Sequence, residues 1–150
     1  MFTWKEIIDI AIQIETNGER IYRRAAQKAA DPAMSEALTR MAGEEARHAE
    51  WFARLPLPDA LSKTPSSLDK MARIFISEAM MDKALSLETA DFSAMTGILD
   101  LVKTSVEFEE DTVLFFEMIR QFVDDDTTIA LLDTIIAEEK NHIATLESWK

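Results

Sequence analysis

Two parts of the chain carry the same pattern of glutamate and histidine residues, displaced by 94 positions. Both histidines of the chain belong to this pattern, and each lies three residues after a glutamate. Apolar residues follow the same displacement, as in the pairs Leu38/Leu132 and Tyr22/Phe116. Such a repeat is too long for a solenoid unit and indicates one helical unit present twice. The corresponding polar residues are Glu15 and Glu109, Glu45 and Glu139, and His48 and His142.

Each copy of the repeat has the apolar spacing of two amphipathic helices joined by a short turn. We expect hairpins over about 3–55 and 92–149. Asp31-Pro32 separates the helices of the first hairpin, because Asp is a preferred N-cap and Pro suits the first helical position. Asp124-Asp125-Asp126 does the same in the second, whose first helix is expected over about 92–122. Thr3 to Glu6 matches a capping box.

The order of these elements predicts an all-α fold. Short turns make antiparallel neighbours, and one long crossover, here 56–91, completes a four-helix bundle. Residues 67–81 should form a short amphipathic helix within the crossover, which either covers one end of the bundle or supports a homodimer. The 150 residues suit one domain, 1–150, of ordinary size.

Composition excludes several classes of function. A net charge of −12 argues against binding to nucleic acid or to an anionic membrane surface, which both need basic patches. The absence of cysteine excludes disulfides, cysteine zinc sites and thiol catalysis by this chain, and fits a cytoplasmic location. No apolar run is long enough to span a bilayer, and the N-terminus lacks the features of a signal peptide.

The repeated glutamates should meet at one level of the bundle. Each lies about 15 residues from its hairpin turn, which is roughly 22 Å of helix. Within each Glu-x-x-His motif the two side chains share a helix face. Four carboxylates and two imidazoles then converge in an apolar layer, where the carboxylates would repel one another without compensating charge.

Two divalent cations would cancel the four negative charges of this layer. Carboxylate and imidazole ligands suit iron, manganese or zinc, and their affinity order does not select iron. Glu15 and Glu109 would be terminal ligands, one per metal, and Glu45 and Glu139 would bridge the pair. The remaining two ligands, His48 and His142, would each complete one metal. The alternative is a metal-free bundle that keeps the pattern without binding.

Several neighbouring residues compete for a role. Glu107 and Glu110 flank Glu109, but the 94-residue displacement selects Glu109. Glu44 and Glu138 precede the ligands and should lie at the surface or just behind them.

Other residues could support the ligands. Glu19 lies one turn from Glu15, and the hydroxyl of Tyr22 could hydrogen-bond a ligand carboxylate or only find a backbone partner. Gly18 would leave room for dioxygen or peroxide, or serve helix packing; Thr112 occupies its place in the second copy.

The motifs as a group resemble the rubrerythrin branch of the ferritin-like di-iron carboxylate superfamily. The matching segments are Ala11-Ile-Gln-Ile-Glu15 with Tyr22, Ala42-Gly-Glu-Glu45-Ala-Arg-His48 and Ala137-Glu-Glu139-Lys-Asn-His142. The resemblance covers nearly the whole chain. It implies a ferritin-like bundle with a non-haem di-iron site that reduces hydrogen peroxide or dioxygen, often in oxidative-stress defence.

Two departures from the family affect the expected activity. Typical rubrerythrins carry a rubredoxin domain with four cysteines, and this chain has none, so a separate protein should donate the electrons. The family also tends to have a further glutamate where Thr112 stands, which puts its redox-linked ligand exchange in question. An iron-handling protein with ferrous iron as substrate, and a non-catalytic metal-stabilised bundle, are the alternative functions.

Overall fold

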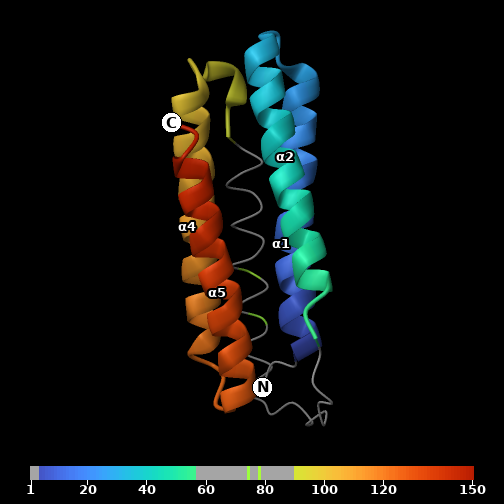
Figure 1. Cartoon of the computed structure of the whole chain (residues 1–150), viewed down its shortest axis with the longest axis vertical. Coiled ribbons are helices and arrows are strands. Elements are labelled where there is room, and N and C mark those ends of the chain that lie inside the picture. The colour runs from blue at the N-terminus through green and yellow to red at the C-terminus, as the bar shows by residue number, and fades with distance from the viewer. Residues whose placement is uncertain (1–3, 57–73, 75–77, 79–89) are drawn as a thin grey trace.

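Four long helices form an antiparallel bundle (Figure 1). They are α1 (Trp4–Lys28), α2 (Pro32–Ala53), α4 (Ile98–Arg120) and α5 (Asp126–Glu147), and a short 3-10 turn, η1 (Phe92–Ala94), precedes α4. This computed structural model describes residues 4–56, 74, 78 and 90–150, which contain no strand. The predicted all-α four-helix bundle is confirmed.

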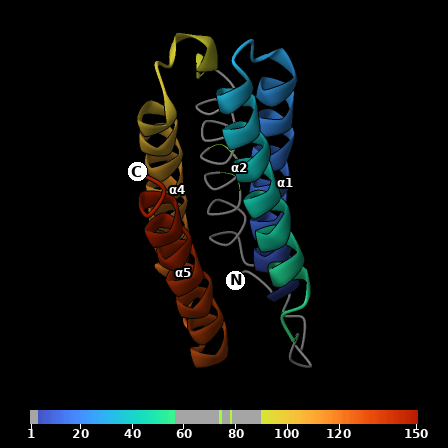
Figure 2. The same ribbon diagram turned by 45° about the horizontal axis from the view of Figure 1, so that its top comes forward.

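The helices are arranged as two hairpins that lie side by side (Figures 1 and 2). One hairpin consists of α1 and α2 and the other of α4 and α5, and their turns lie at opposite ends of the bundle. The bounds follow the 94-residue displacement: α2 begins at Pro32 and ends at Ala53, and α5 begins at Asp126 and ends at Glu147. The opposed hairpins bring the middle of each helix to the same level.

Aspartate caps explain where α2 and α5 begin. The side chain of Asp31 accepts a hydrogen bond from the amide of Ala33 at 3.2 Å. Asp125 accepts from the amide of Thr128 at 2.8 Å. Each cap satisfies one of the amides that the first helical turn leaves without a partner, and so fixes the start of the helix.

The third long helix begins six residues later than expected. We predicted its start near residue 92, whereas α4 begins at Ile98. Asp91 caps only the single turn of η1, accepting from the amide of Ser93 at 3.1 Å. The backbone is then extended at Met95 and at Gly97, and an extended residue interrupts the helical hydrogen bonds. The same displacement from Trp4, the first residue of α1, leads to Ile98.

Some predictions lie outside the described residues. These are the capping box at Thr3 and most of the crossover, including the helix expected over 67–81. Of its apolar residues the structure describes Ile74, whose exposed fraction is 62%. None of the described helices combines the length and the apolar composition that crossing a membrane requires.

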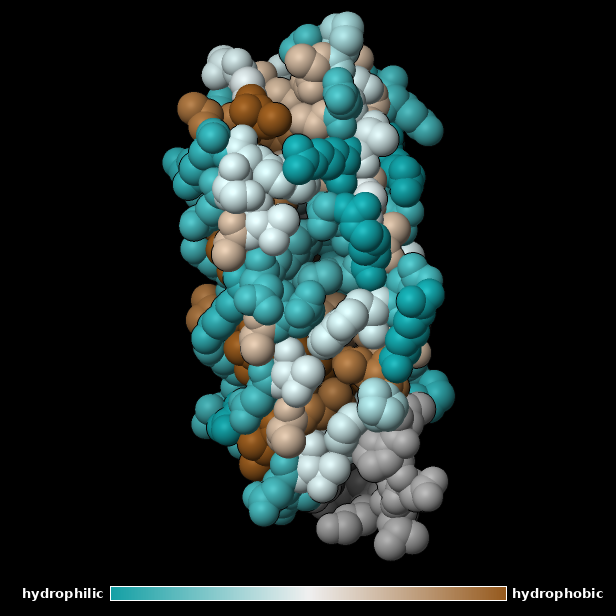
Figure 3. Space-filling model, in the orientation of Figure 1, coloured by the Kyte–Doolittle hydropathy of each residue, from teal (hydrophilic) through white to brown (hydrophobic). Residues whose placement is uncertain are grey.

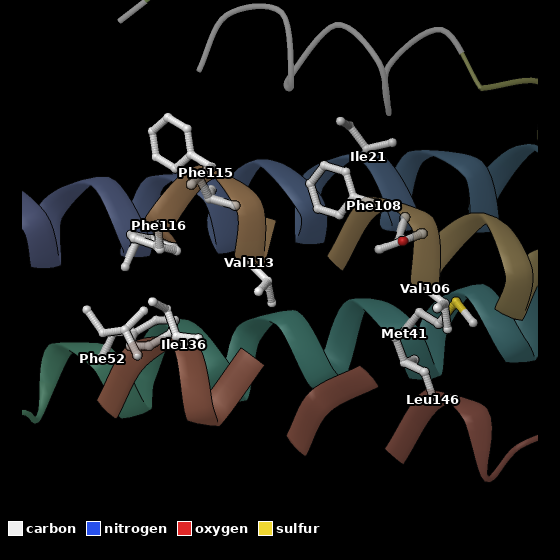
Figure 4. Close-up of a cluster of buried hydrophobic side chains, with 14 of the residues drawn as sticks. Ile21, Met41, Phe52, Val106, Phe108, Val113, Phe115, Phe116, Ile136 and Leu146 are labelled. Atoms are coloured by element: carbon white, nitrogen blue, oxygen red, sulfur yellow. The ribbon is translucent and has the colours of Figure 1, made fainter. Parts of the chain in front are cut away.

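The apolar core is one cluster along the bundle, and Figure 4 shows two groups of its side chains, referred to below as layers, with Val113 between them. Phe52, Phe116 and Ile136 lie toward one end, and Met41, Val106 and Leu146 lie toward the other. The glutamates of α2, α4 and α5 fall between these layers in the sequence. Hydrophilic side chains predominate on the surface shown in Figure 3, as expected for a bundle that turns its apolar faces inward.

Candidate metal centre

Six polar side chains from four helices are buried at the middle of the bundle. None of them is more than 8% exposed, although glutamate is almost never buried unless it is paired. Each helix contributes through the face that carries its apolar residues, so the helical spacing that forms the core also turns these groups inward. They are Glu15 of α1, Glu45 and His48 of α2, Glu109 of α4, and Glu139 and His142 of α5.

Within this group of six, each imidazole lies against one carboxylate from its own hairpin and one from the other. Nδ1 of His48 is 3.5 Å from Oε1 of Glu15 and 3.7 Å from Oε2 of Glu139. The second imidazole repeats this arrangement: Nδ1 of His142 is 3.5 Å from Oε1 of Glu109, and its Nε2 is 4.0 Å from Oε1 of Glu45. The six groups therefore form one cluster that joins the two hairpins.

The oxygen and nitrogen atoms of the cluster are close enough to share cations. Glu15, Glu45, Glu109 and His142 each offer an atom within 4.8 Å of the others, and a second overlapping group adds His48 to Glu15 and His142. The two imidazole rings have centroids 4.3 Å apart. Glu139 joins the cluster through its contact with His48. Overlapping groups of oxygen and nitrogen ligands are what a dinuclear centre requires.

The protein itself does not balance the charge of this cluster. Within the described ranges no lysine or arginine is buried. Burial raises the pKa of Glu15 well above its usual value, and the charge of Glu139 raises it further. The pKa of Glu139 is raised by burial and then by the charge of Glu109. Burial also lowers the pKa of both imidazoles, that of His142 to about 3, so the histidines are neutral at pH 7.

The hydrogen-bonding groups of the cluster also fit a metal. Both carboxylate oxygens of Glu15 and of Glu139, and both ring nitrogens of His142, have no hydrogen-bond partner among the described residues. Leaving a buried polar group without a partner costs about 1–3 kcal/mol, and more for a charged group. A bound cation would coordinate these atoms and remove the cost, so the donor set fits a metal centre.

The neighbouring acidic residues, except Glu138, have no described contact with the cluster. Glu107 and Glu110 are exposed. Glu19 accepts a hydrogen bond from Arg23 at 2.9 Å. Glu44 forms an ion pair with Arg47, and Glu138 contacts Nε2 of the His48 ring. Of these acids, Glu138 is the one whose described contacts reach the cluster.

Tyr22 is buried beside the cluster but is bonded to a residue we did not predict. Its hydroxyl donates to Oγ of Ser105 at 2.9 Å, and Ser105 donates to Sδ of Met41 at 3.1 Å. Burial and the charge of Glu45 raise the pKa of Tyr22. The repeat could have indicated this pair, because both residues differ from their counterparts in the other copy: Tyr22 corresponds to Phe116, and Ser105 corresponds to Ala11. Each of these two residues departs from the repeat, and their hydroxyl groups pair with each other.

Gly18 packs against the carboxylate of Glu45. A Cβ atom at Gly18 would lie 3.2 Å from Oε2 of Glu45 and 3.3 Å from its carboxyl carbon. The residue thus gives the carboxylate of Glu45 room beside α1. At the corresponding position Thr112 is fully buried, and its hydroxyl donates to the carbonyl of Phe108 at 3.1 Å.

A cavity of about 600 Å³ lies at the end of the bundle that holds the α1–α2 turn. Arg24, Lys28, Met34 and Phe92 are among its lining residues, and none of the six clustered side chains lines it. The cavity is therefore separate from the candidate metal centre.

The comparison with protein-family models agrees with the motifs. The profile of the Rubrerythrin family matches residues 6–150. A crystal structure of a proposed ferritin-like diiron-carboxylate protein from Thermotoga maritima is 16% identical, with a TM-score of 0.48 over 98% of this chain and 93% of that chain. No curated protein sequence matches this one. The family match confirms the predicted resemblance and covers all four described helices almost completely.

Proposed function

The chain belongs to the rubrerythrin family, and on this premise we propose that it is a non-haem di-iron oxidoreductase. It reduces hydrogen peroxide or dioxygen with electrons from a separate donor protein. The observation that carries the proposal is the buried cluster of four glutamates and two histidines, with no lysine or arginine buried among the described residues to balance its charge.

The six side chains have distinct tasks in this proposal. Glu15 and Glu109 would each hold one iron, Glu45 and Glu139 would be shared by the two, and His48 and His142 would complete the set of ligands. Two bound ferrous ions would supply the two electrons that cleave the O–O bond. Manganese or zinc would suit the same ligands, but zinc could not supply electrons. Reduction of hydrogen peroxide to two waters consumes two electrons and two protons.

The surrounding helices keep bulk water from the site. The apolar layers that contain Phe52 and Phe116 on one side and Met41 and Leu146 on the other are almost fully buried. A dry site strengthens the interaction of the carboxylates with cations and prevents side reactions. These 150 residues contain no cysteine that could hold an iron–sulfur centre, and we propose a separate protein as the electron donor for re-reduction.

Metal content and turnover test the proposal. We expect protein purified without a metal-affinity tag to contain two iron ions per chain and to show the near-ultraviolet absorption of a coupled ferric pair. With a chemical reductant it should consume peroxide over many turnovers, and Glu109→Ala should abolish this, whereas Glu110→Ala, at an exposed neighbour, should not. Equal rates for both variants would contradict the proposed site.

Thr112 favours a second candidate, an iron-handling protein that oxidises ferrous iron as its substrate. The fully buried Thr112 offers a hydroxyl that is bonded to the Phe108 carbonyl, where the family tends to have a further carboxylate. Stopped-flow oxidation distinguishes the two. Release of ferric product without reductant supports iron handling, whereas retained iron and repeated peroxide turnover support the oxidoreductase. A bundle that binds metal for stability alone would do neither.

A further inference from the structure

The two Glu-x-x-His motifs have corresponding sequences but different surroundings. Each is preceded by a glutamate, Glu44 in α2 and Glu138 in α5. These two glutamates have different contacts. Glu138 reaches across to the histidine of the other hairpin, and Glu44 does not contact a histidine in any described interaction. The proposed ligands follow the internal repeat, but the contacts of Glu44 and Glu138 next to them do not.

His48 is held by a hydrogen bond on the side that faces away from the cluster. Its Nε2 is 3.2 Å from Oε1 of Glu138, whose side chain is 29% exposed. Its Nδ1 faces inward, 3.5 Å from Oε1 of Glu15. A neutral imidazole carries one proton, and a carboxylate accepts but does not donate when ionised. Nε2 therefore carries the proton and donates to Glu138, which leaves the lone pair of Nδ1 directed at the cluster.

His142 lacks this support. Both of its ring nitrogens are without a hydrogen-bond partner in the described part of the chain, although the side chain is only 2% exposed. Glu44, which corresponds to Glu138, forms an ion pair with Arg47 one turn along its own helix. Position 141, which corresponds to Arg47, holds Asn. Glu138 therefore has no arginine at this position with which to form the equivalent ion pair within α5.

We propose that Glu138 is a positioning residue that makes the two metal positions unequal, so that the position served by Glu15 and His48 binds its metal first and more tightly. The carboxylate fixes the tautomer and the ring orientation of His48 before metal arrives. His142 has to be ordered by the metal itself, which lowers the affinity of its position. Losing a carboxylate behind a ligating histidine typically weakens metal binding about 10–100-fold.

The inference rests on the proposed metal centre and is tested by equilibrium binding instead of activity. Anaerobic titration of metal-free protein with Co²⁺, followed by visible absorption and calorimetry, should resolve two steps in the wild-type chain. Glu138→Ala should weaken the tighter step about 10–100-fold and leave the other unchanged. Glu138→Gln, which keeps a neutral acceptor at Oε1, should recover part of the loss.

Glu44→Ala is the matched control, because it removes the corresponding carboxylate but no described histidine contact. Nitrogen NMR of the Zn²⁺-loaded protein identifies the affected ring, since the chain has only two histidines. One ring should be protonated at Nε2 and hydrogen-bonded, and Glu138→Ala should change that resonance alone.

Two results would overturn the inference alone. Equal effects of Glu138→Ala and Glu44→Ala, or two wild-type steps that Glu138→Ala leaves unchanged, would overturn it while the proposed function stands. A wild-type chain that binds no Co²⁺, Zn²⁺ or iron would overturn the proposed function together with it. The two failures are therefore distinguishable in one set of titrations.

Discussion

Gly18 sets how closely α1 approaches the carboxylate of Glu45. A methyl group there would be 3.2 Å from Oε2 of Glu45, which is tighter than ordinary contact. We predict that Gly18→Ala weakens metal binding, because a carboxylate fixed between two cations cannot move aside as a free one can. The metal-free variant should fold normally, since Ala favours helix over Gly by about 1 kcal/mol. Metal titration and thermal unfolding of both forms measure the difference.

Gly43→Ala provides the control for this prediction. A Cβ atom at Gly43 would meet only the end of the Arg47 side chain, at 3.9 Å. This variant should gain up to about 1 kcal/mol of helix stability and bind metal as the wild type does. Unchanged metal affinity in Gly18→Ala would show that Glu45 adapts freely.

The hydroxyl pair of Tyr22 and Ser105 should behave as a unit. Ser105→Ala leaves the Tyr22 hydroxyl buried without its acceptor, at a cost of about 1–3 kcal/mol in unfolding free energy. Tyr22→Phe combined with Ser105→Ala should cost much less than the sum of the single changes, because it removes both polar groups. The double variant places in these helices the Phe and Ala that the other copy of the repeat carries.

Urea unfolding of the four proteins in this double-mutant cycle measures the coupling. Additive costs would mean that the 2.9 Å hydrogen bond contributes little to stability. Because Tyr22 is not bonded to a ligand in any described interaction, the double variant should also retain metal stoichiometry. Loss of metal would instead indicate that the hydroxyl pair supports the ligands.

For individual residues, the sequence identified which side chains are buried together but not which other side chains contact them. Glu109 was distinguishable from Glu107 and Glu110 because the displacement and the apolar spacing agree on one face. The contact of Glu138 with His48 was not predictable, because it depends on how two helices from different hairpins are set against each other. Local spacing contains no information about that arrangement.

The starts of the helices depend on single capping side chains. Asp125→Ala removes the acceptor that bonds the amide of Thr128 at 2.8 Å. We predict a loss of about 1 kcal/mol, within the usual range for an N-cap, and no change in metal stoichiometry. Asp124→Ala, at the exposed preceding residue, is the control and should have little effect. Chemical denaturation measures both, and an equal loss in the two variants would contradict the capping role.

The late start of α4 shows what apolar spacing misses at the scale of an element. The residues after Phe92 continue a helical pattern, but Asp91 caps only one turn and the chain is extended at Gly97. The helix start that matches Trp4 of α1 is Ile98, so comparison between the copies was the more accurate guide. Capping and backbone geometry determine an end that periodicity alone cannot locate.

The whole molecule contains a layer of acids between its two hairpins, and this layer determines how a metal-free chain responds to pH. The pKa of Glu15 is raised above 4.5 in the folded state, so the folded chain keeps a proton that the unfolded chain releases as pH rises. Stability from this group is present below about pH 4.5 and is lost as pH rises through the folded pKa. Metal-free protein should therefore become less stable toward alkaline pH on account of this group.

Glu15→Gln tests that prediction. Without metal, the stability of this variant relative to the wild type should increase between about pH 5 and about pH 8, because the amide does not ionise. With metal the order should reverse, since the variant has lost a ligand. Urea unfolding with a chelator and with Zn²⁺ measures both. Parallel pH curves for the two metal-free proteins would contradict the raised pKa.

The fold class followed from the sequence because the ligand pattern and the apolar pattern repeat together. Short turns next to Asp31 and Asp125 fixed which helices are antiparallel neighbours. The structure of the crossover could not be predicted in this way, because the chain contains no second copy of it for comparison. Most of its residues also lie outside the described ranges.

The placement of the hairpin turns at opposite ends has a consequence for how such a protein can arise. Each hairpin supplies one lone glutamate and one Glu-x-x-His motif, which is half of the buried cluster and of the proposed ligands. A half-length ancestor that self-associated about a two-fold axis would have assembled all six ligands from identical subunits. Fusion of two such genes would then have freed each half to diverge, and Arg47 opposite Asn141 is the kind of difference that identical subunits could not have had.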